Sequence, residues 1–158
     1  QPLVPLERTV YALNIDGAGY SDTSAVTVVG LGRTTADDAI RTGAAAFGLD
    51  VLPDPAPEQN LFDRSDNVSL ARKGVPAPTF SGGFHAFSDP GVGEYYHNAR
   101  DEADTFDFAY LQRFVQAYAH AARRIANRCL LGLPADQEER RDLHLGPVQR
   151  GDHLRTRR

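Results

Sequence analysis

The sequence has little cysteine and no long apolar run, and each of these shortages excludes a class of protein. Its single cysteine, Cys129, excludes an internal disulfide and any zinc site built from several cysteines. A metal would have to be held by histidine and carboxylates. No stretch approaches the roughly 18 consecutive apolar residues of a membrane span, and the opening QPLVPLERTV has no charged segment followed by an apolar one, as an export signal would.

The charge balance argues against nucleic acid as a partner. The net charge is −4, and arginine and aspartate alternate along most of the chain, so the sequence has no basic stripe. The length of 158 residues and the hydrophobic content of 41% suit one domain with a real core. We expect this domain to span residues 1–131.

The last segment, residues 132–158, differs in composition from the rest of the chain. It has no aromatic residue and carries six arginines. Two readings stay open, a disordered tail or the product of a reading-frame shift in a gene of high GC content. Neither reading bears on the chemistry of the domain.

Hydrophobic periodicity and turn residues predict an alternation of strands and helices. We predict, in chain order, a strand over 9–16, a strand over 25–32, a helix over 35–48, a proline-rich loop over 52–64, a short helix over 65–74, a strand over 75–81, a long loop over 82–106 and a helix over 107–128. This order favours an α/β layer fold with a parallel or mixed sheet.

Two of these elements carry further expectations. In the last helix, Asp107 is a good N-cap, and apolar residues recur at three- and four-residue spacing. The predicted buried stripe consists of Leu111, Phe114, Val115, Tyr118, Ala122 and Ile125. In open α/β sheets ligands bind beyond the carboxyl ends of the strands, which is where the first predicted strand places Asp16.

His97 lies in EYYHNARDEAD, among carboxylates that include Asp101 and Asp104. A neutral imidazole binds a transition metal, and a carboxylate that accepts its other N–H fixes the tautomer and raises the basicity of the ligand. The acidic surroundings of His97 therefore suit a metal ligand. They equally suit a solvated acidic turn in which Asp104 and Asp107 are helix caps, and these residues alone do not decide between the two.

Three blocks together are more specific than any one motif. The blocks are ALNIDGAGY, PDPAPEQNLFDRSDNVSLARKGVPAPTFS and YYHNARDEADTFDFAYLQRFVQAYAHAARRIANR. In the order and spacing of these blocks, the chain from Val10 to Arg128 resembles the C-terminal half of the zinc-dependent aminopeptidases of peptidase family M28. The resemblance implies an α/β three-layer sandwich with a mixed, mostly parallel sheet, incomplete in this chain. It also implies two zinc ions as cofactors, peptide substrates with a free N-terminus, and export to the periplasm or the extracellular space.

The resemblance assigns roles to individual residues. Asp16 matches the strand-end aspartate of the family and would bind one zinc, and His97 matches the final histidine and would bind the other. Tyr96 matches a tyrosine whose hydroxyl stabilises the developing oxyanion. The sequence does not decide whether Tyr96 or its neighbour Tyr95 faces the site.

Other residues would support these ligands or contact the substrate. Arg64 and Asp66 match the family's R-S-D-H block, although Asn67 stands where histidine is usual. Asp101 matches the acid four residues after the final histidine. Phe84, together with Phe80 and Phe87, would line an apolar pocket for the substrate side chain or simply pack in the core.

The remaining ligands of the family have no counterpart in this sequence. The first histidine, the bridging aspartate and the Glu-Glu pair are not found before Asp16, so we expect a fragment that is inactive alone and partners with the missing N-terminal half. Two alternatives stay open. One is the same fold without peptidase activity, either a glutaminyl cyclase-like enzyme, which Tyr96 disfavours, or a metal-free interaction domain; the other is a small non-enzymatic α/β module.

Overall fold

A four-stranded mixed sheet forms the centre of the molecule in the computed structural model, which describes residues 3–17 and 20–130. Its strands are β1 (Asn14–Ile15), β2 (Asp22–Val29), β3 (Asp50–Pro53) and β4 (Thr79–Gly83), in the order β1-β4-β2-β3. The pairs β1–β4 and β2–β3 are parallel, and β2–β4 is antiparallel. The expected mixed, mostly parallel sheet is confirmed.

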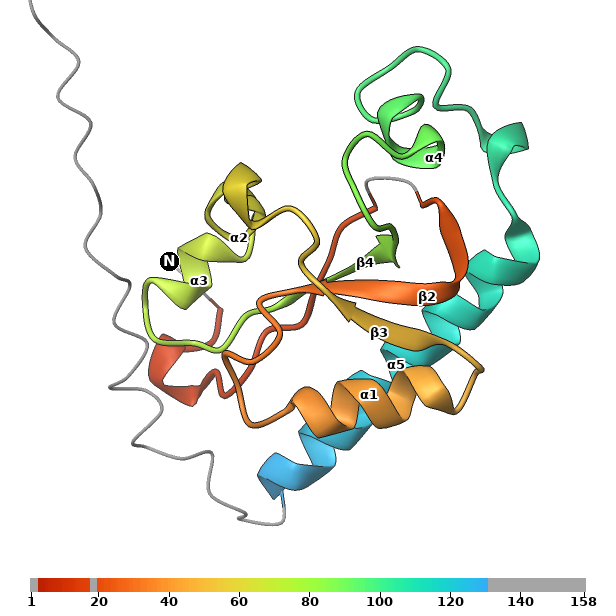
Figure 1. The fold of residues 1–158 in the computed structure, drawn as a ribbon. Coiled ribbons are helices and arrows are strands. Elements are labelled where there is room, and N and C mark those ends of the chain that lie inside the picture. The colour runs from red at the N-terminus through yellow and green to blue at the C-terminus, as the bar shows by residue number, and fades with distance from the viewer. Residues whose placement is uncertain (1–2, 18–19, 131–158) are drawn as a thin grey trace, which may run out of the picture.

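Helices lie on both sides of this sheet, so the fold is a three-layer α/β arrangement (Figure 1). The two longest helices, α1 (Asp37–Ala45) and α5 (Phe108–Leu130), pack against each other on one face. The short helices α2 (Leu61–Arg64), α3 (Val68–Ala71) and α4 (Pro90–Gly93) lie on the other side. Single 3-10 turns occur at Leu6–Arg8, Pro57–Gln59 and Ala103–Thr105.

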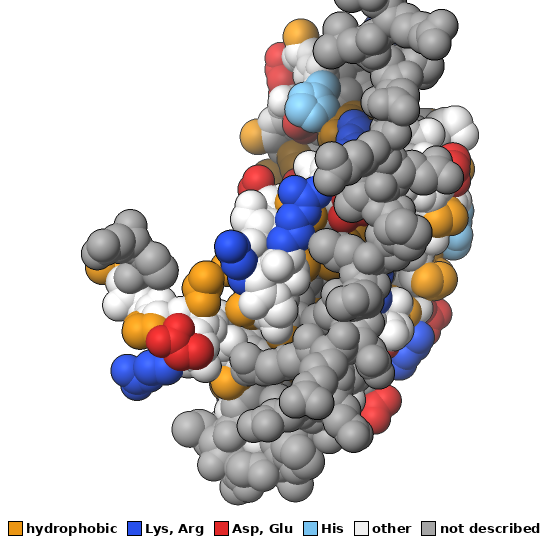
Figure 2. Space-filling view, turned by 90° about the vertical axis from the view of Figure 1, so that its left-hand side faces the viewer, with side chains coloured by type: hydrophobic (Ala, Val, Ile, Leu, Met, Phe, Trp, Pro, Cys, Tyr) orange, Lys and Arg blue, Asp and Glu red, His pale blue; other side chains and the backbone are white. Residues whose placement is uncertain are grey.

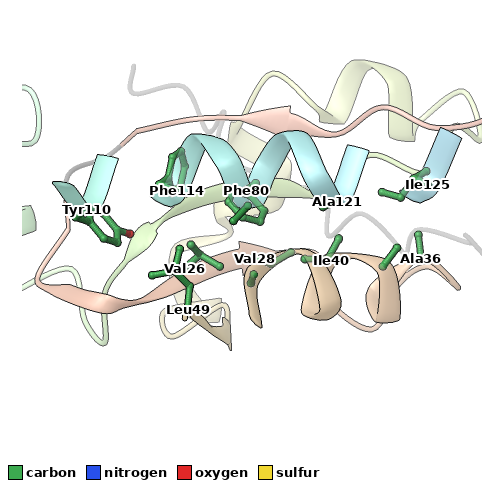
Figure 3. Packing of buried hydrophobic residues seen from close by; sticks show 13 residues of the cluster. Val26, Val28, Ala36, Ile40, Leu49, Phe80, Tyr110, Phe114, Ala121 and Ile125 are labelled. Carbon is green, nitrogen blue, oxygen red and sulfur yellow. The ribbon is translucent and has the colours of Figure 1, made fainter. Parts of the chain in front are cut away.

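The main core lies between the sheet and the α1/α5 pair (Figure 3). Alternate side chains of a strand point to opposite faces, so Val26 and Val28 join this core, whereas Val29 packs with α2 and α3 in a second, smaller cluster. Small residues bring the two long helices close together. A Cβ on Gly43 would lie 2.8 Å from the Cβ of Ala121, a contact that real side chains do not make.

Tyr110 closes a gap in the sheet. The β2–β4 ladder shifts register between Asp22 and Val26, so the strands cannot satisfy each other's backbone groups there. The Tyr110 hydroxyl donates a hydrogen bond to the carbonyl of Ala25 (2.8 Å) and accepts one from the N–H of Gly83 (2.9 Å). Helix α5 is thereby attached to both central strands.

The predicted strand over 9–16 is mostly wrong, because only Asn14–Ile15 is a strand. The partner of the preceding residues contains Pro76 and Pro78, which have no N–H to donate to the ladder. Their carbonyls still accept hydrogen bonds from the N–H groups of Ala12 (2.9 Å) and Asn14 (3.0 Å). Residues 12–14 therefore donate hydrogen bonds to the proline segment but receive none from the proline nitrogens. For the same reason, the predicted strand over 75–81 begins only at Thr79.

Other boundaries also differ from the prediction. Strand β2 begins at Asp22 and ends at Val29, before the turn at Gly30 to Gly32 that the prediction had included. The predicted proline-rich loop over 52–64 was wrong in part, since it contains the end of β3 and all of α2. Strand β3 is an edge strand that ends on Pro53, and sheets tolerate proline at edges and at strand ends. The predicted helix over 65–74 is reduced to α3, and the loop over 82–106 contains α4.

The last helix is confirmed, and Asp107 caps it through its Oδ1, which accepts a hydrogen bond from the N–H of Tyr110 (3.0 Å). The predicted buried stripe was wrong at Val115, which is 49% exposed. Leu111 and Tyr118 are partly buried against the core. The stripe is confirmed at Phe114 and Ile125, and the other buried positions of the helix core are Tyr110, Ala117 and Ala121.

The surface carries mixed charge. On the face shown in Figure 2, acidic, basic and hydrophobic side chains are interspersed wherever described residues are visible. No helix among the described residues is long and apolar enough to cross a membrane. The predicted divergent tail, residues 132–158, lies outside the described residues.

Candidate functional site

A cavity of about 310 Å³ brings together residues that are far apart in the sequence. It lies over the side of the sheet that carries Val29, Thr79 and Ser81, opposite the α1/α5 core. The two side chains predicted to bind metal, Asp16 and His97, line this cavity. The full lining consists of Asp16, Val29, Leu61, Arg64, Ser65, Asp66, Thr79, Ser81, Phe84, Phe87, Tyr96 and His97.

Asp16 is held at the end of β1 by a short hydrogen-bond chain. Its N–H donates to the carbonyl of Phe80 (3.2 Å), which continues the β1–β4 pairing. The hydroxyl of Ser65 donates to Asp16 Oδ2 (3.1 Å). Asn14 in turn donates from Nδ2 to Thr79 Oγ1 (3.1 Å) and, at a longer 3.5 Å, to Ser65 Oγ. The Ser65 contact orients the carboxylate and leaves Oδ1 available to a ligand.

His97 has an unusual backbone for a residue with a side chain. Its φ of 54° lies in the left-handed region, and Asn60 is the other non-glycine residue with positive φ in the described chain. Within the same part of the chain, the imidazole lies edge-to-face with the ring of Tyr96 (centroids 4.2 Å apart) and has no hydrogen-bond partner. Both ring nitrogens are therefore free to bind a ligand in the cavity.

The structure separates the two tyrosines that the sequence left open. Tyr96 lines the main cavity, whereas Tyr95 lines a second cavity of about 40 Å³. Asp101 also belongs to this second cavity, beside Tyr20 and Phe106. The structure therefore places Asp101 with the loop aromatics and not with Asp16 and His97 in the main cavity.

The R-S-D block lies at the main cavity as expected. Arg64 is exposed and donates to the carbonyl of Gln59 (3.2 Å), and Asp66 has an exposed side chain beside it. Asn67 points elsewhere, because it is buried and donates from Nδ2 to the carbonyl of Ala77 (2.9 Å). It holds the turn before β4, and its Oδ1 has no hydrogen-bond partner among the described residues.

The three phenylalanines predicted to form a pocket divide between core and cavity. Phe84 and Phe87 line the cavity. Phe80 does not, since it lies on the opposite side of β4 and packs against Phe114 and Tyr118 in the main core. Strand alternation explains the difference, because Phe80 is one residue from Thr79 and Ser81, which face the cavity.

The loop that carries Tyr96 and His97 is anchored by groups that sequence analysis missed. The carboxylate of Asp89 accepts hydrogen bonds from the hydroxyl of Ser21 (2.5 Å) and from the N–H groups of His85 (2.8 Å) and Ala86 (3.1 Å). The Ser21 hydroxyl, followed by these N–H groups, holds the pKa of Asp89 below its usual range. The Asp-Pro-Gly start of α4 was the available signal for this turn.

A second contact attaches the same loop to β2. Nε2 of His85 lies 2.9 Å from Oδ2 of Asp22, whose Oδ1 accepts hydrogen bonds from the hydroxyl and N–H of Ser24 (2.6 and 2.8 Å). The Ser24 contacts lower the pKa of Asp22, with a smaller contribution from His85. The start of β2 thus holds the loop through Asp22, and its end contributes Val29 to the cavity wall.

The donor set for a metal is incomplete in the described residues. Zinc sites in proteins use three or four protein ligands. In residues 3–17 and 20–130, no group of three or more histidine, cysteine, aspartate or glutamate side chains lies close enough together to hold a metal ion. Asp16 and His97 therefore fit two positions of a zinc site but do not form one by themselves.

Fold and site together define a class. The chain is an α/β protein whose polar and aromatic side chains meet in a cavity beside the end of a strand, the usual place for a ligand in such folds. The family model for Peptidase family M28 matches residues 1–122. The chain therefore belongs to peptidase family M28, and its class at family level is metallopeptidase. No curated protein and no solved structure matched the chain significantly.

Proposed function

We propose that this chain forms part of the active site of an exported zinc aminopeptidase, with Asp16 and His97 as metal ligands. The observation that supports this is the meeting of Asp16, Tyr96 and His97 in one cavity, in a chain that belongs to a metallopeptidase family. Zinc, when bound, would polarise the scissile carbonyl and lower the pKa of a water. Because the described residues supply only two ligands, we assign no step to the metal.

The chain's own residues would bind and orient the substrate. The carboxylate of Asp66 suits the ammonium of a free N-terminus, and the guanidinium of Arg64 suits a carbonyl or carboxylate oxygen. The buried ring of Phe84 would form an apolar wall for the N-terminal side chain. The hydroxyl of Tyr96 would donate to the oxygen on which negative charge develops.

The missing functions would come from residues outside the described part. A closed metal site needs at least one more ligand, and hydrolysis needs a general base such as glutamate. We propose that these belong to an N-terminal half of the same catalytic domain, encoded before Gln1 or supplied as a separate chain. The 158-residue chain alone would then bind zinc weakly and have no peptidase activity.

The test compares this chain alone with the chain expressed behind its upstream coding sequence. Release of the N-terminal residue from leucine p-nitroanilide and zinc binding by calorimetry are measured for both. We expect activity and tight zinc binding only in the longer protein, and loss of both in His97→Gln and Asp16→Asn. His120→Gln, on α5 away from the cavity, is the matched control and should retain activity.

Two results would contradict the proposal. If the longer protein binds zinc but instead cyclises N-terminal glutamine, the fold serves a glutaminyl cyclase-like reaction. If it binds no zinc and cleaves no peptide, this is a metal-free interaction domain of the same family. Export is tested separately, by locating the longer protein in cell fractions; a cytoplasmic location would refute that part.

A further inference from the structure

Four aromatic rings run in a line from the buried sheet to His97. Ring centroids are 5.9 Å apart for Phe84 and Phe87, 5.3 Å for Phe87 and Tyr96, and 4.2 Å for Tyr96 and His97. The planes of each pair meet at 85–89°, the edge-to-face geometry that aromatic rings prefer. Each ring therefore limits the orientation of the next.

The inner end of this line is fixed to the sheet. Phe84 is 1% exposed, and its N–H donates a hydrogen bond to Oγ1 of Thr27 (3.1 Å), a fully buried residue of β2. The same hydroxyl lies 3.4 Å from the carbonyl of Phe84. Phe84 thus belongs to the rigid part of the fold.

The outer end has little else to hold it. Tyr96 is 37% exposed, and the imidazole of His97 has no hydrogen-bond partner among the described residues. The left-handed backbone of His97 is a sparsely populated conformation that persists only when its surroundings favour it. The backbone N–H of Tyr96 is bonded to Val92 (2.8 Å), but this does not set the direction of either ring.

We propose that Phe87 is a positioning residue: its half-buried ring transmits the fixed orientation of Phe84 to Tyr96 and so directs the His97 imidazole into the cavity. No other described residue contacts both Phe84 and Tyr96 through an aromatic ring. The consequence for catalysis rests on the proposed function, whereas the orientation itself does not.

The test uses the 158-residue chain and the ring-proton resonances of His97 in NMR, assigned by their loss in His97→Gln. A ring as close as that of Tyr96 shifts these resonances strongly, so they report the orientation of the pair. Phe87→Leu keeps an apolar side chain but removes the ring. We expect it to move the His97 resonances toward those of free histidine, and Phe87→Tyr, which keeps the ring, to restore them.

Phe106→Leu is the matched control. Phe106 lies in the same loop, is 38% exposed and pairs with Tyr20 and Phe108, outside the line of four rings. Its substitution should leave the His97 resonances in place. If Phe87→Leu disturbs folding, Phe87→Met tests the same point with an unbranched apolar side chain.

Two outcomes separate this inference from the proposed function. Unchanged His97 resonances in Phe87→Leu or Phe87→Met would overturn the positioning role, whatever the activity. In the longer, active protein, losing the energy of one edge-to-face contact should lower kcat/KM about two- to tenfold in Phe87→Leu. Phe87→Tyr keeps the ring and should retain the kcat/KM of the unmodified protein. Shifted resonances in the 158-residue chain, together with no peptidase activity in the longer protein, would support the positioning role and refute the proposed function.

Discussion

Replacing Tyr110 by phenylalanine removes only a hydroxyl, yet it should destabilise the fold substantially. The hydroxyl satisfies two backbone groups where the β2–β4 ladder is interrupted, the carbonyl of Ala25 and the N–H of Gly83. Tyr110 is 2% exposed, so water cannot replace it without a rearrangement. A buried polar group left without a partner costs about 1–3 kcal/mol. Two such groups give an expected loss of about 2–6 kcal/mol in the free energy of unfolding.

Urea unfolding of the 158-residue chain, followed by far-UV circular dichroism, measures this loss. Tyr118→Phe is the control, because the Tyr118 hydroxyl makes one hydrogen bond, to the carbonyl of Leu13 (2.7 Å), at a partly buried position. It should cost about 1 kcal/mol. Equal losses in the two variants would refute the reasoning, because the hydroxyl of Tyr110 would then have no special role in the sheet.

The pH dependence offers an independent check on Tyr110. Burial raises its pKa to about 12, from an ordinary value of 10.0. Since the folded-state pKa is the higher one, the stabilisation is complete below pH 10 and is lost as the pH rises toward 12. At 1.36 kcal/mol for each pKa unit the loss approaches about 3 kcal/mol. Tyr110→Phe should show less alkaline destabilisation than the unmodified chain.

Three further predictions concern the loop anchor, the helix pair and the buried face of α5. The hydrogen bonds that lower the pKa of Asp89 stabilise the fold above the ordinary pKa of 3.8, and this stabilisation is lost as the pH falls through the lower folded-state pKa. In Asp89→Asn the urea midpoint should therefore depend less on pH as the solution is acidified below pH 3.8, and an unchanged acid dependence would contradict the assignment. Gly43→Ala should cost about 1–3 kcal/mol, because the new Cβ would lie 2.9 Å from the backbone N of Ala121; thermal unfolding measures this, and a neutral result would mean that α1 and α5 separate easily. Val115→Ser should change stability by less than about 0.5 kcal/mol, because Val115 is half exposed, whereas Ala117→Ser at a fully buried position should be clearly destabilising; the opposite order in chemical unfolding would restore the stripe predicted from the sequence.

Sequence reasoning named most of the residues that line the main cavity, whereas their roles stay predictions, and it was less accurate on the strands. Six of the predicted site residues line the main cavity: Asp16, Arg64, Asp66, Phe84, Tyr96 and His97. They were identified by short blocks whose order and spacing resemble a family, and such blocks survive local errors in strand assignment. Asp101 was assigned because it matches the acid four residues after the final histidine of the family, but it lines the second cavity with Tyr95 and not the main one.

The errors in the fold have physical causes that periodicity does not reveal. Two prolines in a partner segment shortened β1, although nothing within residues 9–13 indicates this. The buried face of α5 includes the small residues Ala117 and Ala121, which allow close contact with Gly43 of α1, whereas the larger Val115 lies outside it. Val115 follows the buried Phe114 by one residue, which places it about 100° further around the helix axis.

By itself the sequence determined the fold class, the long capped helix, the family and the residue types available to the site. Local patterns specify these properties, since they depend on periodicity, caps and short motifs. Only the tertiary structure decided which tyrosine faces the cavity, that Phe80 packs against α5 while Phe84 and Phe87 line the cavity, and that Tyr110 bridges the two central strands. Those outcomes depend on strand register and on contacts between distant segments, which are set when the whole chain packs.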